Sequence, residues 1–172
     1  MRPRIMNLLR TSLLAVALCL VVTSCSKDEP LAENETNYSV DLSLANKTDW
    51  QMSNEILTLI NRHRAQLDLA PVMLDKQLVT AYAVMHTEYM IANSDLSHDN
   101  YAQRSQALIQ NGASRVGENV AKGYLTAEAV VNAWLHSPAH KRVIEGDYTH
   151  SGFGVMQNAR GTYYFTHLFY KE

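Results

Sequence analysis

The segment 151–170 constrains the fold most strongly, because it predicts a β-hairpin. The runs "SGFGVMQ" (151–157) and "TYYFTHLFY" (162–170) are rich in aromatic and β-branched residues, and "NARG" between them is typical of a turn. Much of the chain before them has a helical pattern, with apolar residues at helical spacing over 56–67 and 78–90. Helices first and strands last favour an α+β fold.

Local signals divide the helical part. Thr48, followed three residues later by Gln51, resembles a capping box, and Asp75 can cap a second helix. Pro71 disfavours helical geometry at the preceding residue, so the first helix should end before it. We also expect a short helix over 104–110, a strand or extended segment in "RVGENVAKGY" (115–124), and a helix that opens at Thr126.

The stretch "AWLHSPAHKR" (133–142) contains two histidines four residues apart, a spacing that would place them on one face of a single helix. Ser137 before Pro138 is, however, a standard helix start, with serine as N-cap and proline at the first position. We therefore expect one helix to end near His136 and another to begin at Ser137. His140 then lies in a first helical turn, where the macrodipole favours a neutral imidazole.

The N-terminus resembles a lipoprotein signal. A basic start precedes the apolar run "LLAVALCLVV" (13–22), which is too short to span a bilayer, and "VTSC" follows it. This resembles a lipobox and implies cleavage before Cys25 and lipidation of that residue; the alternative is an ordinary secretory peptide cleaved nearby. We predict a signal peptide over 1–24, a lipidated cysteine with an acidic tether over 25–48, and a globular domain over 49–172.

The segment "SKDE" (26–29) resembles an export signal to the outer cell surface, although it is equally well explained as a solvated charge run. We therefore expect an outer membrane lipoprotein, periplasmic or exposed on the surface, with the membrane as one partner through Cys25.

Composition narrows the remaining partners. With 15 Lys+Arg against 17 Asp+Glu, the chain lacks the basic excess of a nucleic-acid-binding protein. Both cysteines, Cys19 and Cys25, lie in the N-terminal segment. The predicted domain therefore needs neither a disulfide nor a cysteine-ligated metal.

Five motifs follow one another within Asn54–Phe169: "LSHDN", "GENVAKG", "VVNAWLHSPAHKRVI", "HSGFGV" and "YYFTHLF". In this order they resemble the bacterial branch of the CAP superfamily, which contains the cysteine-rich secretory proteins, antigen 5 and pathogenesis-related proteins. The resemblance implies an α-β-α sandwich, with a three-stranded antiparallel sheet between helical layers.

The resemblance also implies a cleft with two histidines and two acidic residues. Carried over by motif, these positions are His98, Glu118 and His140, while the second acidic position is Ser137, a departure from the animal and plant pattern. His167 in the last predicted strand is a further candidate for the cleft.

Two imidazoles and one carboxylate suit a divalent metal, with zinc as the favoured cofactor and an open position for water. Such a water could become a nucleophile. The alternative is a hydrogen-bonded structural network without a ligand. The sequence leaves open whether the domain is an enzyme: we favour a module that binds a metal, a small molecule, a lipid or a protein, and a metal-dependent, peptidase-like hydrolase is the second reading.

Overall fold

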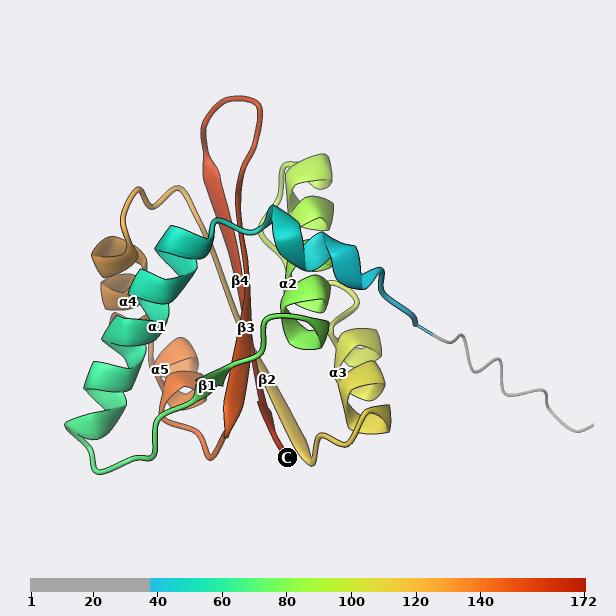
Figure 1. Cartoon of the computed structure of the whole chain (residues 1–172). Coiled ribbons are helices and arrows are strands. Elements are labelled where there is room, and N and C mark those ends of the chain that lie inside the picture. Colours follow the sequence, from blue (N-terminus) through green and yellow to red (C-terminus); the bar gives the residue numbers. More distant parts are fainter. Residues whose placement is uncertain (1–37) are drawn as a thin grey trace, which may run out of the picture. The chain divides into compact units, whose positions relative to one another are not determined.

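The computed structural model describes residues 38–172, which belong to one compact unit (Figure 1). The predicted signal peptide and Cys25 lie outside the described residues. The helices are the 3₁₀ helix η1 (Leu42–Lys47) and the α-helices α1 (Trp50–Ala65), α2 (Leu78–Asn93), α3 (Tyr101–Gln110), α4 (Ala127–His136) and α5 (Pro138–Ile144). The strands are β1 (Met73–Leu74), β2 (Arg115–Lys122), β3 (His150–Gln157) and β4 (Tyr163–Lys171).

The strands form one mixed sheet in the order β1-β3-β4-β2. The pairs β2–β4 and β3–β4 are antiparallel, as expected, and β3 and β4 form the predicted hairpin. The sheet has one strand more than the three that were expected, because the two-residue strand β1 pairs with β3 in parallel. Just before β1, the side chain of Asn61 bonds both the amide and the carbonyl of Val72 and so fixes the backbone that leads into this strand.

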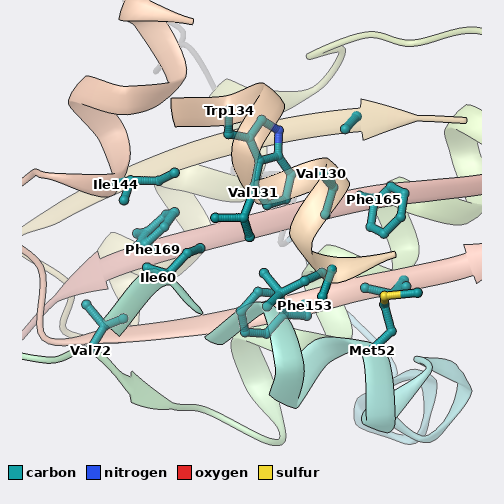
Figure 2. Packing of buried hydrophobic residues seen from close by; sticks show 14 of the residues in the cluster. Met52, Ile60, Val72, Val130, Val131, Trp134, Ile144, Phe153, Phe165 and Phe169 are labelled. Atoms are coloured by element: carbon teal, nitrogen blue, oxygen red, sulfur yellow. The ribbon is translucent and has the colours of Figure 1, made fainter. Parts of the chain in front are cut away.

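Helices cover both faces of the sheet (Figure 1): α1, α4 and α5 lie on one side, and α2 and α3 on the other. The larger hydrophobic cluster lies between the sheet and the first group, with Trp134 of α4 packed among residues of β3, β4 and α1 (Figure 2). On the other face α2 approaches β3 closely. A Cβ atom on Gly154 would lie 2.3 Å from the carbonyl oxygen of Ala83, so only glycine permits this distance.

The predicted helix starts are close to the observed ones, but the caps differ. The N-cap of α1 is Asp49, whose carboxylate accepts from the amide of Met52, rather than Thr48. The hydroxyl of Thr48 instead accepts from the amide of Val155 and so joins the start of α1 to β3. Thr126 caps α4 as predicted.

Part of the segment expected to be a tether is packed on the domain. Tyr38 stacks on Tyr82 of α2 with ring centroids 6.0 Å apart, and the hydroxyl of Tyr82 donates to the carbonyl of Tyr38. At the end of η1, Lys47 pairs with Glu88 at 2.7 Å. Residues 38–48 therefore extend the folded domain toward the N-terminus. No helix described within 38–172 is long and apolar enough to cross a membrane.

Candidate functional site

The centre of the site is a buried ion pair between Glu118 of β2 and Arg104 of α3. Both side chains are only 1% exposed. The guanidinium donates three hydrogen bonds of 2.7–2.9 Å to the two carboxylate oxygens. A fourth, of 2.7 Å, goes to the carbonyl of Asp99. A buried charge needs such pairing, so the carboxylate is fixed in place and ionised.

His98, in the loop between α2 and α3, adds a further contact to the same carboxylate. Its Nδ1 lies 2.8 Å from Oε1 of Glu118, while 52% of the His98 side chain is exposed. An ionised carboxylate only accepts hydrogen bonds, so Nδ1 carries the proton. In the neutral form of this ring the free lone pair is therefore on Nε2.

The loop that presents His98 is shaped by the start of α3. Asn100 adopts the left-handed conformation (φ 58°), and the carbonyl of His98 accepts from the amide of Tyr101. The hydroxyl of Tyr101 donates to the carbonyl of Val116, which ties this turn to β2. The backbone around His98 is thus anchored on the same strand that carries Glu118.

His140 comes from the opposite side of the sheet. The predicted helix break is confirmed: α4 ends at His136, and α5 begins at Pro138 with Ser137 as N-cap. His140 lies in the first turn of α5, half-buried, and its carbonyl accepts from the side-chain amide of Asn119. Burial lowers the pKa of His140, and the positive charge of protonated His98 lowers it further.

A pocket of about 340 Å³ opens beside the ion pair. Its lining residues are His98, Tyr101, Val116, Gly117, Glu118, Val143 and Tyr148. Gly117 allows this arrangement, because a Cβ there would lie 2.5 Å from the hydroxyl oxygen of Tyr148 and 3.0 Å from Cγ1 of Val143. His140 does not line the pocket but lies in the same helix as Val143.

The other two candidates lie elsewhere. The side chain of Ser137 makes no capping bond and lies at the junction of α4 and α5. His167 is in the core, stacked between Phe153 and Phe169 with centroid distances of 4.0 and 3.8 Å. Complete burial lowers its pKa well below the ordinary value, and neither ring nitrogen has a hydrogen-bond partner among the described residues. His167 therefore does not face the pocket.

The three side chains of the expected metal ligand set differ in the contacts that they already make. Within residues 38–172, no three His, Cys, Asp or Glu side chains lie close enough together to hold a metal ion. Both oxygens of Glu118 accept from Arg104. At this site, Nε2 of His98 and the two ring nitrogens of His140 make no hydrogen bond to a described residue.

Sequence reasoning missed Arg104 and Asn119, although both fix parts of the site. Arg104 was expected only as the start of a short helix. Its separation from Glu118 in the sequence matches no helical or strand spacing that would have indicated a contact between the two residues. Asn119 directly follows Glu118, and in a strand adjacent side chains point to opposite faces. Strand alternation could therefore have indicated that these two residues of "GEN" contact different helical layers.

Residues 57–169 match the family model described as CAP, the cysteine-rich secretory protein family. The chain belongs to this family. Over 123 residues it is 33% identical to the uncharacterized membrane protein YlbC of Bacillus subtilis (strain 168), covering 69% of this chain and 34% of that protein. The uncharacterized protein YkwD of the same organism is 29% identical over 108 residues, covering 60% of this chain and 42% of that protein. The chain thus spans less than half the length of either relative.

Solved structures of similar proteins support the fold. An outer surface protein from Borrelia burgdorferi superimposes with a TM-score of 0.64 at 22% identity, covering 72% of this chain and 94% of that one. An extracellular protein containing an SCP domain from Bacillus anthracis str. Ames gives a TM-score of 0.60 at 25% identity, covering 73% of this chain and 44% of that one. The α+β fold with helices packed on a mixed sheet is therefore that of the CAP family.

Proposed function

We propose that the protein is a membrane-anchored extracellular CAP module that binds a divalent transition metal, zinc being favoured, through Nε2 of His98 and the imidazole of His140. The observation that carries this proposal is the hydrogen bond from Nδ1 of His98 to the buried carboxylate of Glu118. Histidines that bind metals commonly donate their other ring N–H to a carboxylate, which fixes the tautomer and raises the basicity of the ligating nitrogen.

In this proposal Glu118 orients a ligand instead of being one, which revises the sequence-based expectation. Its two oxygens already serve Arg104, so moving it onto a metal would leave a buried guanidinium unpaired. Two imidazoles supply two coordination positions, and water or a partner group supplies the others. The lowered pKa of His140 supports binding, because only neutral imidazole ligates a metal.

The anchored location rests on the lipobox-like "VTSC" and on the relatives. Two of them are named as an outer surface protein and an extracellular protein, and a third as a membrane protein. A lipidated Cys25 would hold the domain at the outer membrane, on its periplasmic or its external face. A small molecule, lipid or protein could complete the metal coordination; a nucleic acid is not expected.

The hydrolase alternative has one supporting observation. A histidine held by a buried carboxylate, with its other nitrogen free, is also the arrangement of a general base. Zinc-dependent cleavage of peptides by the purified protein, abolished by His98→Ala, would replace the binding proposal with this one. If peptides remain intact at every zinc concentration tested, binding is the better description.

The direct test is titration calorimetry with zinc at about pH 7.5, together with thermal unfolding. Zinc should raise the melting temperature, because a ligand at a hundredfold excess over its Kd stabilises the folded state by about 2.7 kcal/mol. The heat of binding should vanish in His98→Ala and in His140→Ala. His63→Ala is the matched control, since His63 pairs with Glu145 away from the pocket.

Two further results of this titration decide the proposal. Zinc binding should weaken as the pH falls through the imidazole range near ~6.5, because protonated rings cannot ligate. If the wild type and His140→Ala bind zinc identically, the metal site is wrong, and His98, Glu118 and Arg104 form a structural network.

A further inference from the structure

A second hollow, of about 590 Å³, lies at the other end of β2. The last turn of α2, the end of β2 and the turn between β3 and β4 surround it. Lys122 lies four residues beyond Glu118 on the same strand, which corresponds to about 13 Å. This hollow is thus separate from the His98 pocket, and its volume lies within the range of small-molecule sites.

The charged side chains that line this hollow are all cationic. Lys122 comes from the end of β2 and Arg160 from the β3–β4 turn, and both are exposed. Within residues 38–172 neither has a carboxylate within salt-bridge distance; Nζ of Lys122 instead lies over the ring of Tyr164, 5.9 Å from its centroid. Two unpaired cations beside one hollow are notable in a chain whose net charge is -2.

Neutral donors also line the hollow. Oδ1 of Asn158 accepts from the amides of Arg160 and Thr162, at 2.9 and 3.0 Å. These bonds fix the orientation of the Asn158 side chain and leave its Nδ2 without a protein acceptor among the described residues. The hydroxyls of Thr162 and Ser94 are further donors at the wall. The hollow therefore offers fixed hydrogen-bond donors as well as positive charge.

The end of α2 is the one feature here that opposes an anion, because carbonyl groups carry partial negative charge at a helix C-terminus. Two of these carbonyls are already occupied: the amide of Ser94 donates to Ile91, and that of Asp95 donates to Met90, both at 3.1 Å. The carboxylate of Asp95 accepts from the amide of Leu96 and does not line the hollow. Two full positive charges thus outweigh a partly neutralised helix end.

We propose that this hollow binds a phosphate group. A phosphate monoester carries close to two negative charges near pH 7, which matches the two cations, and it has three oxygens for donors on different walls. Arg160 can donate a pair of parallel hydrogen bonds, and Lys122 supplies a point charge from the other side. A singly charged carboxylate would match one cation only. The proposal does not depend on the zinc site.

A phosphate group could come from a soluble metabolite or from a phospholipid headgroup, and the experiment separates the two. The compact unit 36–172, which lacks the predicted lipid anchor, is titrated at low ionic strength with inorganic phosphate and with glycerol phosphate, while amide chemical shifts are recorded. A parallel sedimentation assay uses vesicles that contain anionic phosphatidic acid, whose headgroup is a phosphate monoester, and vesicles of neutral phosphatidylcholine alone. The variants are Lys122→Gln and Arg160→Gln, with Lys76→Gln, an exposed lysine before α2, as matched control.

Saturable shifts of the amides of Gly123, Asn158 and Arg160 are expected with the soluble phosphates. Either site variant should bind at least about tenfold more weakly, the usual loss when a charged hydrogen bond is removed, and Lys76→Gln should bind as the wild type does. If the protein sediments with the anionic vesicles but does not bind the soluble phosphates, and if both site variants lose this sedimentation, the phosphate comes from a lipid headgroup. Binding to neither form of phosphate, or equal weakening in Lys76→Gln, overturns the proposal.

Discussion

Replacing Glu118 with glutamine should destabilise the domain more than any other single polar substitution at the site. Glutamine keeps the shape of the side chain but removes its charge, so the guanidinium of Arg104 stays buried without a counter-ion. The amide keeps one acceptor oxygen but puts an NH2 donor in place of the other, so it cannot accept all of the three hydrogen bonds from Arg104 and the one from His98. With both side chains 1% exposed, water cannot replace these bonds without rearrangement.

The expected cost is about 3–5 kcal/mol, the range for removing one partner of a buried ion pair. That is a large share of the roughly 5–15 kcal/mol by which a domain of this size is stable. A matched control is Glu88→Gln, which breaks the pair of Glu88 with Lys47. Those side chains are 36% and 51% exposed, and an exposed pair contributes about 0–1 kcal/mol.

Urea unfolding of the two variants, monitored by circular dichroism, measures both free energies of unfolding. The double variant Arg104→Met with Glu118→Leu completes the comparison. It should lose less stability than the sum of its single substitutions, since neither charge is left unpaired. If Glu118→Gln costs no more than Glu88→Gln, then the pair is accessible to water, and Glu118 cannot be the fixed group that orients His98.

The other predictions concern the core, a close contact and the anchor. Burial lowers the pKa of His167, so below pH ~6.5 the unfolded protein binds a proton at this residue that the folded protein does not bind. The free energy of unfolding is therefore unaffected above pH ~6.5 and falls below it by up to about 1.4 kcal/mol per pH unit. Urea unfolding at about pH 7.5 and 5 should show a smaller loss in His167→Phe, and an equal loss would exclude His167 as the cause. Gly154→Ala should cost about 1–3 kcal/mol in thermal unfolding, since its Cβ would meet the carbonyl oxygen of Ala83; an unchanged melting temperature would mean that α2 shifts freely. Mass spectrometry of the membrane fraction should find acylated Cys25, and an unmodified chain starting elsewhere would end the lipoprotein interpretation. The melting temperature should also be the same with and without reductant, because residues 26–172 contain no cysteine.

The elements that could be predicted are those specified by local sequence. Ser137 and Pro138 indicate the end of one helix and the start of another through the geometry of two adjacent residues, and the structure has that break. The hairpin of β3 and β4 was equally predictable, because strand residues and a turn follow one another directly. In both cases the residues that determine the structure are close together in the sequence.

What the sequence did not indicate depends on partners far apart in the chain. Asn61 bonds the backbone of Val72, eleven residues later and directly before β1. Arg104 reaches Glu118 from a helix on one side of the sheet, and no pattern in either segment indicates the other. The resemblance to the family placed Glu118 among the candidate ligands, and the motif gave no indication of the buried cation that pairs with its carboxylate.

The motif "GEN" on β2 gains a physical explanation from strand alternation. Gly117 and Asn119 face the layer of α5, where the glycine leaves room for Tyr148 and the asparagine amide bonds the carbonyl of His140. Glu118 faces the layer of α3 and holds the ring of His98. Adjacent residues of the edge strand β2 thus contact two elements on opposite sides of the sheet, the segment before α3 and the helix α5 (Figure 1). The strand therefore holds the ring of His98 directly, through Glu118, and holds His140 through its backbone carbonyl.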